Sequence, residues 1–246
     1  MYRQVKDVVL HLSAEDVLRG QGIDPGRAPQ RLVDSANAAI EETHALVSPA
    51  ALYTIVNVTD FEHYRISFEG GSFEGPLVAR ATAGAQQLSI ALCTIGESLE
   101  RRVEEMMRTN MVAAVALDGA GTAALRKVSQ AVEAGIKDEA CKRGLTVGMR
   151  AQPGQEGWPI EQQRQVFSAL PAHEIGIRLT DEFLMIPKKS VSFVIPSGRA
   201  LDSQAVPCDV CSKRSRCGWR KESGSGGIAC LSTAEDAEHV WRQQGR

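Results

Sequence analysis

The 246-residue chain is 43% hydrophobic and 24% charged, which is typical of a folded globular protein and not of a disordered one. Its formal net charge of −2 gives no overall attraction to nucleic acid or to an anionic membrane, so we expect neither as a partner. No window approaches the ~20 apolar residues of a membrane-spanning helix, and charges interrupt the first residues, where a secretion signal needs an apolar run. We therefore expect a cytoplasmic protein.

Two helices are predicted first along the chain. Ser13 can cap a short helix that Gly20 and Gly22 end. A second helix is expected over residues 31–47, because apolar side chains recur there with helical spacing.

The next segments predict strands. Residues 51–61 are rich in β-branched side chains, and the short alternating run over 63–71 can pair with them. Residues 87–96 form an apolar run that a glycine ends, which is typical of a buried strand. Cys93 lies in this run, so we expect it to be a core residue.

Helices and strands alternate in the second half of the chain. Apolar side chains at helical spacing predict helices over 97–110 and 123–144, and a Pro/Gly-rich stretch, "GMRAQPGQEGWP", follows them. The remaining predicted elements are a helix over 161–170 and strands over 175–179 and 190–196. Charged residues between the last two strands, Asp181, Glu182, Lys188 and Lys189, are expected to be solvated. Together these elements predict an α+β domain over residues 1–206, with helices around a mostly antiparallel sheet.

Residues 119–124, "GAGTAA", resemble a dinucleotide-binding loop, but that loop has to follow a strand. The preceding "MVAAVALD" has an alanine-rich, helical character instead. The glycines are better explained by close packing between helices. Hydrolase, phosphate-loop and HExxH signatures are missing from the sequence, and its five histidines are scattered.

The composition changes from about residue 207 onward, so we expect a separate Cys-rich module over 207–246. Two cysteines spaced as CxxC can bind one metal, because the turn brings both sulfurs to the same side. Four ligands complete either a tetrahedral zinc site or an iron–sulfur cluster, and the spacing alone leaves these two open. Zinc tolerates irregular spacing, whereas the neighbouring basic residues would stabilise an anionic [4Fe-4S] cluster. The expected ligands are Cys208, Cys211, Cys217 and Cys230.

Two separated motifs resemble the activation domain of cobalamin-dependent methionine synthase. The first is the Arg-x-x-Pro-Gly turn in "TVGMRAQPGQEGWPIEQQRQVF", which a helix follows. The second combines IGxxLT with M-x-P-x-x-SVS in "IGIRLTDEFLMIPKKSVSFV". The chain is more similar still to stand-alone relatives of that domain that accompany corrinoid methyltransferase systems, where "TIGESLE", "LDGAGTAAL" and a C-terminal cysteine cluster also occur. The resemblance extends from about Cys93 to Ile195.

The resemblance implies an S-adenosylmethionine site. In the family the turn arginine binds the ligand's carboxylate, which corresponds to Arg150, and the turn backbone from Gln152 to Gly154 lies against the ligand. An acidic residue on the preceding helix, here Glu133, faces the ligand's ammonium group. This chain departs from the family at two positions: Gln155 replaces a tyrosine, and Gln152 replaces a small residue.

The resemblance also implies a corrinoid partner, because the chain has no DxHxxG sequence with which to carry its own cobalamin. The first expected function is reductive reactivation of that corrinoid protein, with electrons supplied through a [4Fe-4S] cluster on the four clustered cysteines. The alternative is a non-catalytic adaptor that caps the corrinoid protein and has a structural zinc site. Nucleic-acid binding through a basic zinc knuckle has less support, since Trp219 is the one aromatic residue beside the basic residues.

Overall fold

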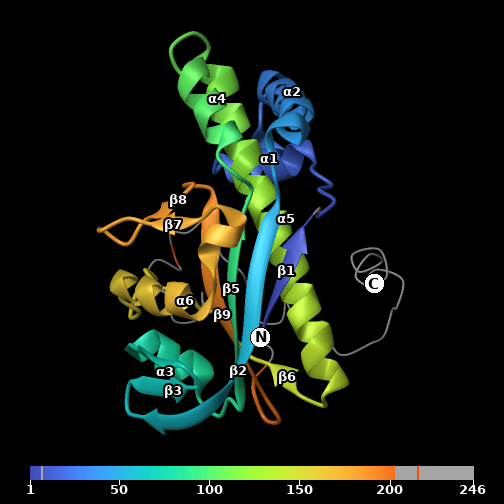
Figure 1. Cartoon of the computed structure of the whole chain (residues 1–246). Helices are drawn as coiled ribbons and strands as arrows, with labels where there is room; N and C mark the ends of the chain where they lie inside the picture. The colour runs from blue at the N-terminus through green and yellow to red at the C-terminus, as the bar shows by residue number, and fades with distance from the viewer. Residues whose placement is uncertain (7, 203–214, 216–246) are drawn as a thin grey trace, which may run out of the picture.

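The structure is a computed structural model that describes residues 1–6, 8–202 and 215. In this part of the chain, helices pack around an antiparallel sheet (Figure 1). The main sheet contains β1 (Tyr2–Lys6), β2 (Ala50–Glu62), β3 (Arg65–Phe68), β4 (Gly71–Glu74), β5 (Gln87–Thr94), β6 (Thr146–Val147) and β9 (Ser190–Gly198). A small separate hairpin pairs β7 (Arg178–Leu179) with β8 (Met185–Ile186).

The helices are of very different lengths. The α-helices are α1 (Ala14–Gly20), α2 (Gln30–Leu46), α3 (Pro76–Thr82), α4 (Ser98–Met106), α5 (Met111–Lys142) and α6 (Gln163–Ala169). Three short 3₁₀ helices are η1 (Pro25–Arg27), η2 (Ile160–Gln162) and η3 (Ala172–Ile175). In Figure 1, α1, α2 and α4 gather around one end of α5, while α3 and α6 lie on the opposite side of the sheet.

The strand order is β4-β3-β2-β5-β9-β6, and β1 also pairs with β2. The first part of β2 pairs with both β1 and β5, whereas its last residues pair with β3 after a shift in register between Val58 and Asp60. Such a shift bends the strand and lets the β3–β4 hairpin curl away from the main sheet. The expected α+β fold with a mostly antiparallel sheet is confirmed for the described residues.

The sheet is buried on both faces, so it separates two hydrophobic cores. Successive side chains of β5 point to opposite faces. Leu88, Ile90 and Leu92 pack with residues of α3 and α6, whereas Ala91 and Cys93 pack with residues of α4 and α5. This explains why the strand has a continuous apolar sequence rather than an alternating one.

The long helix α5 depends on glycines where it meets other helices. A Cβ on Gly20 of α1 would overlap the carbonyl oxygen of Gly119, and one on Gly121 would lie 2.7 Å from Leu99 Cδ2. Residues 119–124 are therefore inside a helix and serve close helix packing, as the sequence predicts. A dinucleotide-binding loop is excluded at this position.

Several local signals are confirmed. Ser13 is the N-cap of α1, and its hydroxyl and backbone form a reciprocal capping box with Asp16. The second predicted helix corresponds to α2, and the strand predicted over 87–96 corresponds to β5. The predicted pairing of residues 51–61 with 63–71 is the pairing of β2 with β3.

Other predictions need correction. The strand expected over 175–179 is reduced to β7, because η3 occupies the residues before it. The last strand does not end at Pro196 but continues to Gly198, since a proline without an N–H can still accept a hydrogen bond, here from the Gly148 N–H at 2.9 Å.

Lys189 is not a solvated charge. Its side chain is 16% exposed, and Nζ lies 2.9 Å from Asp118 Oδ1 and 2.8 Å from Thr122 Oγ1, which ties the start of β9 to α5. Lys188 is exposed, as expected. Among the helices of the described residues, none is long and apolar enough to cross a membrane. The predicted Cys-rich module over 207–246 lies outside the described residues, apart from residue 215, so the boundary at 206/207 stays a prediction.

Candidate functional site

Arg150 is held at the margin of the main sheet. The segment after β6 runs antiparallel to β9, and Ala151 and Val194 exchange backbone hydrogen bonds of 3.0 and 2.8 Å. Met149 and Ala151 are buried in the core that contains α3 and α6. Because side chains alternate along an extended segment, the side chain between them faces the other way, toward α5.

The Arg150 guanidinium meets an acidic side chain there. Its Nη1 donates to Glu133 Oε1 and to Ser129 Oγ, the latter at 3.3 Å, and its Nη2 lies 3.5 Å from Gln152 Oε1. The side chains of Arg150 and Glu133 are 25% and 28% exposed. The centre of the guanidinium lies 4.0 Å from the centroid of the Phe193 ring, which makes a cation–π contact.

Each neighbour of Arg150 is fixed by its own element. Ser129 and Glu133 are four residues apart on α5 and therefore share one face of the helix. The Ser129 hydroxyl donates to the Arg126 carbonyl oxygen at 3.0 Å, so its oxygen is oriented to accept from Arg150. Phe193 belongs to β9 and is completely buried.

Cys93 lies close enough to this ion pair to feel both of its charges, and it is fully buried. Burial raises the pKa of Cys93 to about 12, with the Arg150 charge opposing this increase and the Glu133 charge adding to it. The thiol therefore stays protonated at neutral pH and does not act as a nucleophile. This agrees with the prediction that Cys93 is a core residue.

The turn after Arg150 is closed by its own residues. Gln155 Oε1 accepts a hydrogen bond of 2.9 Å from the Gln152 N–H. Gly154 has a φ of +88°, which favours glycine, and a Cβ there would lie 2.9 Å from Ile160 Cδ1. The Gly154 N–H donates to the Trp158 carbonyl oxygen at 2.9 Å. Gly154 is thus required by the turn itself, whether or not a ligand lies against it.

Trp158 anchors this turn in the core. Its side chain is 1% exposed and packs edge-on against Phe73, with ring centroids 5.2 Å apart. Within the described residues, its indole N–H has no hydrogen-bond partner. The sequence "GWP" is explained by this anchor: Gly157 has a φ of +84°, and its carbonyl oxygen accepts a hydrogen bond from the Leu77 N–H in the first turn of α3.

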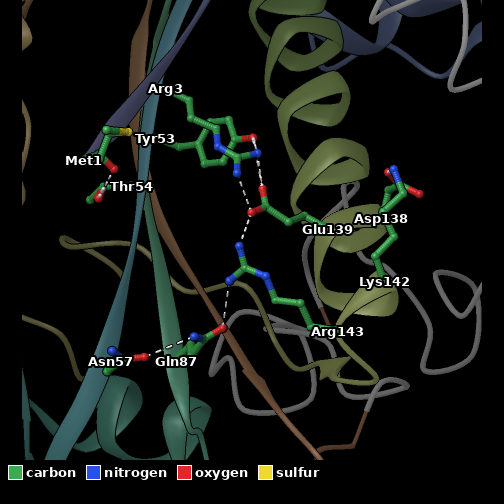
Figure 2. A network of polar contacts seen from close by, with 10 residues as sticks. All are labelled: Met1, Arg3, Tyr53, Thr54, Asn57, Gln87, Asp138, Glu139, Lys142 and Arg143. Carbon is green, nitrogen blue, oxygen red and sulfur yellow. Dashed lines mark hydrogen bonds and ion pairs between the residues drawn. The ribbon is translucent and has the colours of Figure 1, made fainter.

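A second charged cluster lies further along α5 (Figure 2). Glu139, whose side chain is 12% exposed, accepts hydrogen bonds from Arg3 of β1 and from Arg143. Arg143 also donates to Gln87 Oε1 at 3.3 Å, and Arg3 to the Tyr53 hydroxyl at 3.3 Å. Burial, before any other cause, raises the pKa of Tyr53. This cluster fastens α5 to β1, β2 and β5, and so fixes the helix that carries Glu133.

The structure brings together Glu133, Arg150 and Gln152, and it places Gln155 and Gly154 in the adjoining turn. The predicted metal ligands Cys208, Cys211, Cys217 and Cys230 lie outside the described residues. Within the described residues, no group of three or more His, Cys, Asp or Glu side chains is arranged to hold a metal ion.

Ser129 and Phe193 were not predicted as part of the site. The spacing of Ser129 and Glu133 on one helical face is a signal that could have identified the serine. Phe193 has no such signal, because its position depends on how Arg150 aligns with β9.

Comparisons with known proteins bear on the fold. No family model matches the sequence, and neither does any curated protein. The structure is similar to the crystal structure of the MetH reactivation domain bound to AdoHcy, with a TM-score of 0.60 and 12% sequence identity over 82% of this chain and 80% of that one. At this identity the similarity establishes a shared fold, and it confirms the fold that the two sequence motifs imply.

Proposed function

We propose that this protein binds S-adenosylmethionine beside Arg150 and Glu133 and supports the reductive reactivation of a corrinoid protein. The observation that carries the proposal is the ion pair between these two partly buried side chains at the edge of the main sheet. The fold supports it, because the similar MetH reactivation domain was crystallised with AdoHcy.

The chemistry of the two side chains fits the amino-acid end of the ligand. A guanidinium presents paired donors that match a carboxylate, and a glutamate can accept hydrogen bonds from an ammonium group. S-Adenosylmethionine carries both groups on one carbon. The cation–π contact with Phe193 and the hydrogen bond to Ser129 hold the Arg150 guanidinium in place for this contact.

The two departures from the family affect the turn beside the ligand. Gln155 occupies the Gln152 N–H, so we propose that the ligand meets the side chains of Gln152 and Gln155 rather than this amide. Gly154 allows the backbone conformation of this turn, and the space of its missing Cβ is filled by Ile160.

Reactivation of an oxidised corrinoid requires one electron and then methylation. The partner's corrinoid supplies the cobalt and S-adenosylmethionine the methyl group, while this chain holds the amino-acid end of the methyl donor. We propose that the four clustered cysteines would hold a [4Fe-4S] cluster, which would supply the electron; zinc, the alternative metal, has no redox chemistry and would be structural. The support for this step is their spacing in the sequence.

One observation favours a second function. Arg150 and Glu133 form an ion pair with each other, and the Gln155 side chain accepts a hydrogen bond from the Gln152 N–H. The groups that would bind a ligand are therefore already paired within the protein. A non-catalytic adaptor that caps a corrinoid protein and carries a structural zinc needs no open ligand site.

Calorimetric titration of S-adenosylmethionine separates the two functions. We expect the wild type to bind, and Arg150→Ala to weaken binding by about 1.5–3 kcal/mol, the range for a hydrogen bond to a charged group. Arg150→Lys should restore part of this loss, because an ammonium cannot make the planar two-point contact. Arg101→Ala is the matched control, since Arg101 forms an exposed ion pair with Glu97 at 3.6 Å.

A folded wild type that binds no S-adenosylmethionine at millimolar concentration would reject the first function and favour the adaptor. For reactivation itself, the readout is the absorbance of oxidised cobalt in a corrinoid protein mixed with a low-potential reductant, S-adenosylmethionine and either wild type or Arg150→Ala.

A further inference from the structure

An exposed apolar patch lies where α4 is joined to α5. Its side chains are between 41% and 66% exposed, and they are Met107, Met111, Val112 and Val115. In Figure 1 this junction lies at the end of the molecule farthest from β3. Single exposed apolar residues are common on protein surfaces, but several gathered in one place mark a surface that another molecule covers.

The patch and the proposed ligand site lie on the same face of α5. Val115 and Glu133 are eighteen residues apart, which is about five helical turns and about 27 Å along the axis. Between them, Lys189 lies against the helix, with its Nζ 2.8 Å from Thr122 Oγ1. A molecule that lies along this face would therefore contact the helix mainly at two places, the patch and the ligand site.

We infer that the patch is a docking surface for the corrinoid protein, which contacts it at one end and covers the ligand site at the other. This inference rests on the proposed function, because methyl transfer requires the corrinoid to lie next to the bound S-adenosylmethionine. The distance fits such a partner, since about 30 Å is the diameter of a small domain.

The size of the patch argues against a second copy of this chain as the occupant. A stable complex buries about 800 Å² on each partner. Four partly exposed aliphatic side chains fall well short of this area, so the patch needs a second contact region to hold a partner. A corrinoid protein has that second region at the ligand site, whereas a second copy has no reason to cover it.

The charges beside the patch indicate what the partner presents. Among the described residues, Arg108 has no ion-pair partner, whereas Arg101 pairs with Glu97 and Arg102 with Glu42. An unpaired guanidinium at the rim of an apolar patch is complementary to a carboxylate on the other protein. The expected partner surface is therefore an apolar depression with an acidic residue at its rim.

The test changes the patch without disturbing the helix. Met111 and Val112 are the first two residues of α5, where aspartates stabilise the helix N-terminus, so Met111→Asp/Val112→Asp should fold normally. The probe is the corrinoid protein that the wild type reactivates. We expect the double variant to raise the Kd for this protein, measured by interferometry, and its KM in the cobalt absorbance assay about 10- to 100-fold. The kcat at saturation and the affinity for S-adenosylmethionine should not change.

Two further variants sharpen the comparison. Tyr64→Asp is the matched control, because Tyr64 is an exposed apolar residue just before β3, at the other end of the molecule, and its replacement should change neither Kd nor KM. Arg108→Glu should raise the Kd at low salt and do so less at about 0.5 M salt, where exposed charges are screened. Circular dichroism verifies that all variants are folded.

Three results overturn the inference. If the double variant has the Kd and KM of wild type, the partner docks elsewhere, although the proposed function stands. If sedimentation velocity shows a wild-type dimer that the double variant does not form, a second copy covers the patch. If the wild type neither binds nor reactivates a corrinoid protein, the proposed function fails and this inference fails with it.

Discussion

Among the glycines of the described residues, Gly20 of α1 has the closest neighbour to its missing Cβ, and Gly20→Ala tests this contact with α5. A Cβ at position 20 would overlap the carbonyl oxygen of Gly119 and lie 2.9 Å from its carbonyl carbon. Both are main-chain atoms of a helix, so they cannot move aside as a side chain end would. The backbone of Gly20 does not have a positive φ, so alanine itself is not strained there.

The magnitude follows from two opposing effects. Overpacking of a tight contact costs about 1–3 kcal/mol. The better helix propensity of alanine offsets at most about 1 kcal/mol of this cost. Because Gly20 is the last residue of α1, little of this offset applies, and we expect Gly20→Ala to lower the free energy of unfolding by about 1–3 kcal/mol.

Urea denaturation followed by far-ultraviolet circular dichroism measures this change, provided that the slope of the transition is the same in both proteins. Gly26→Ala is the matched control: it lies just beyond α1, does not have a positive φ, and a Cβ there would be 3.6 Å from its nearest neighbour, Asp24 Oδ1. It should change stability by less than about 0.5 kcal/mol. A Gly20→Ala protein as stable as wild type would refute the packing argument.

The remaining predictions concern cysteines and the turn. Cys208→Ala and Cys211→Ala should each lose bound iron or zinc, measured in protein purified without oxygen, while Cys93→Ala should retain it; equal metal content in all three would reject the assignment. Because the folded pKa of Cys93, about 12, is above its unfolded value of 9.0, the unfolded state loses a proton first and wild-type stability should fall as pH rises from 9 to 12. Urea titrations at several pH values measure the free energy of unfolding, and Cys93→Ala should lose less of it between pH 9 and 12 than wild type does. An equal loss in the two proteins would contradict the raised pKa of Cys93. Gly154→Val should lower the melting temperature even without ligand, because of its φ of +88° and its contact with Ile160; an unchanged melting temperature would show that the turn tolerates a side chain.

Local signals allowed much of the fold to be predicted from sequence. The capping box at Ser13 and the apolar periodicity of α2 depend on residues close in the chain, so their effects could be derived directly. The strand β1 could not be found in this way, since Tyr2–Lys6 is short and mostly exposed and is stabilised by pairing with β2. Lys189 was misjudged for the same reason: its partners on α5 are about 70 residues away in sequence.

In the candidate site, too, some residues could be predicted from the sequence and others could not. Arg150 and Glu133 were predicted together through the resemblance to a family, and the structure does place them in contact. Phe193 was missed because its position depends on the pairing of Ala151 with Val194, which local sequence does not determine.

The length of α5 has a mechanical consequence. Glu133 lies about 21 Å along the helix axis from Gly119, where α1 crosses α5, because each residue adds about 1.5 Å. A tilt of about 3° around that crossing point would displace Glu133 by about 1 Å, which is enough to break a hydrogen bond. A tilt imposed on α5 at the bundle of α1, α2 and α4 would therefore move Glu133 relative to Arg150, and the contacts of Glu139 with the sheet would oppose such a tilt.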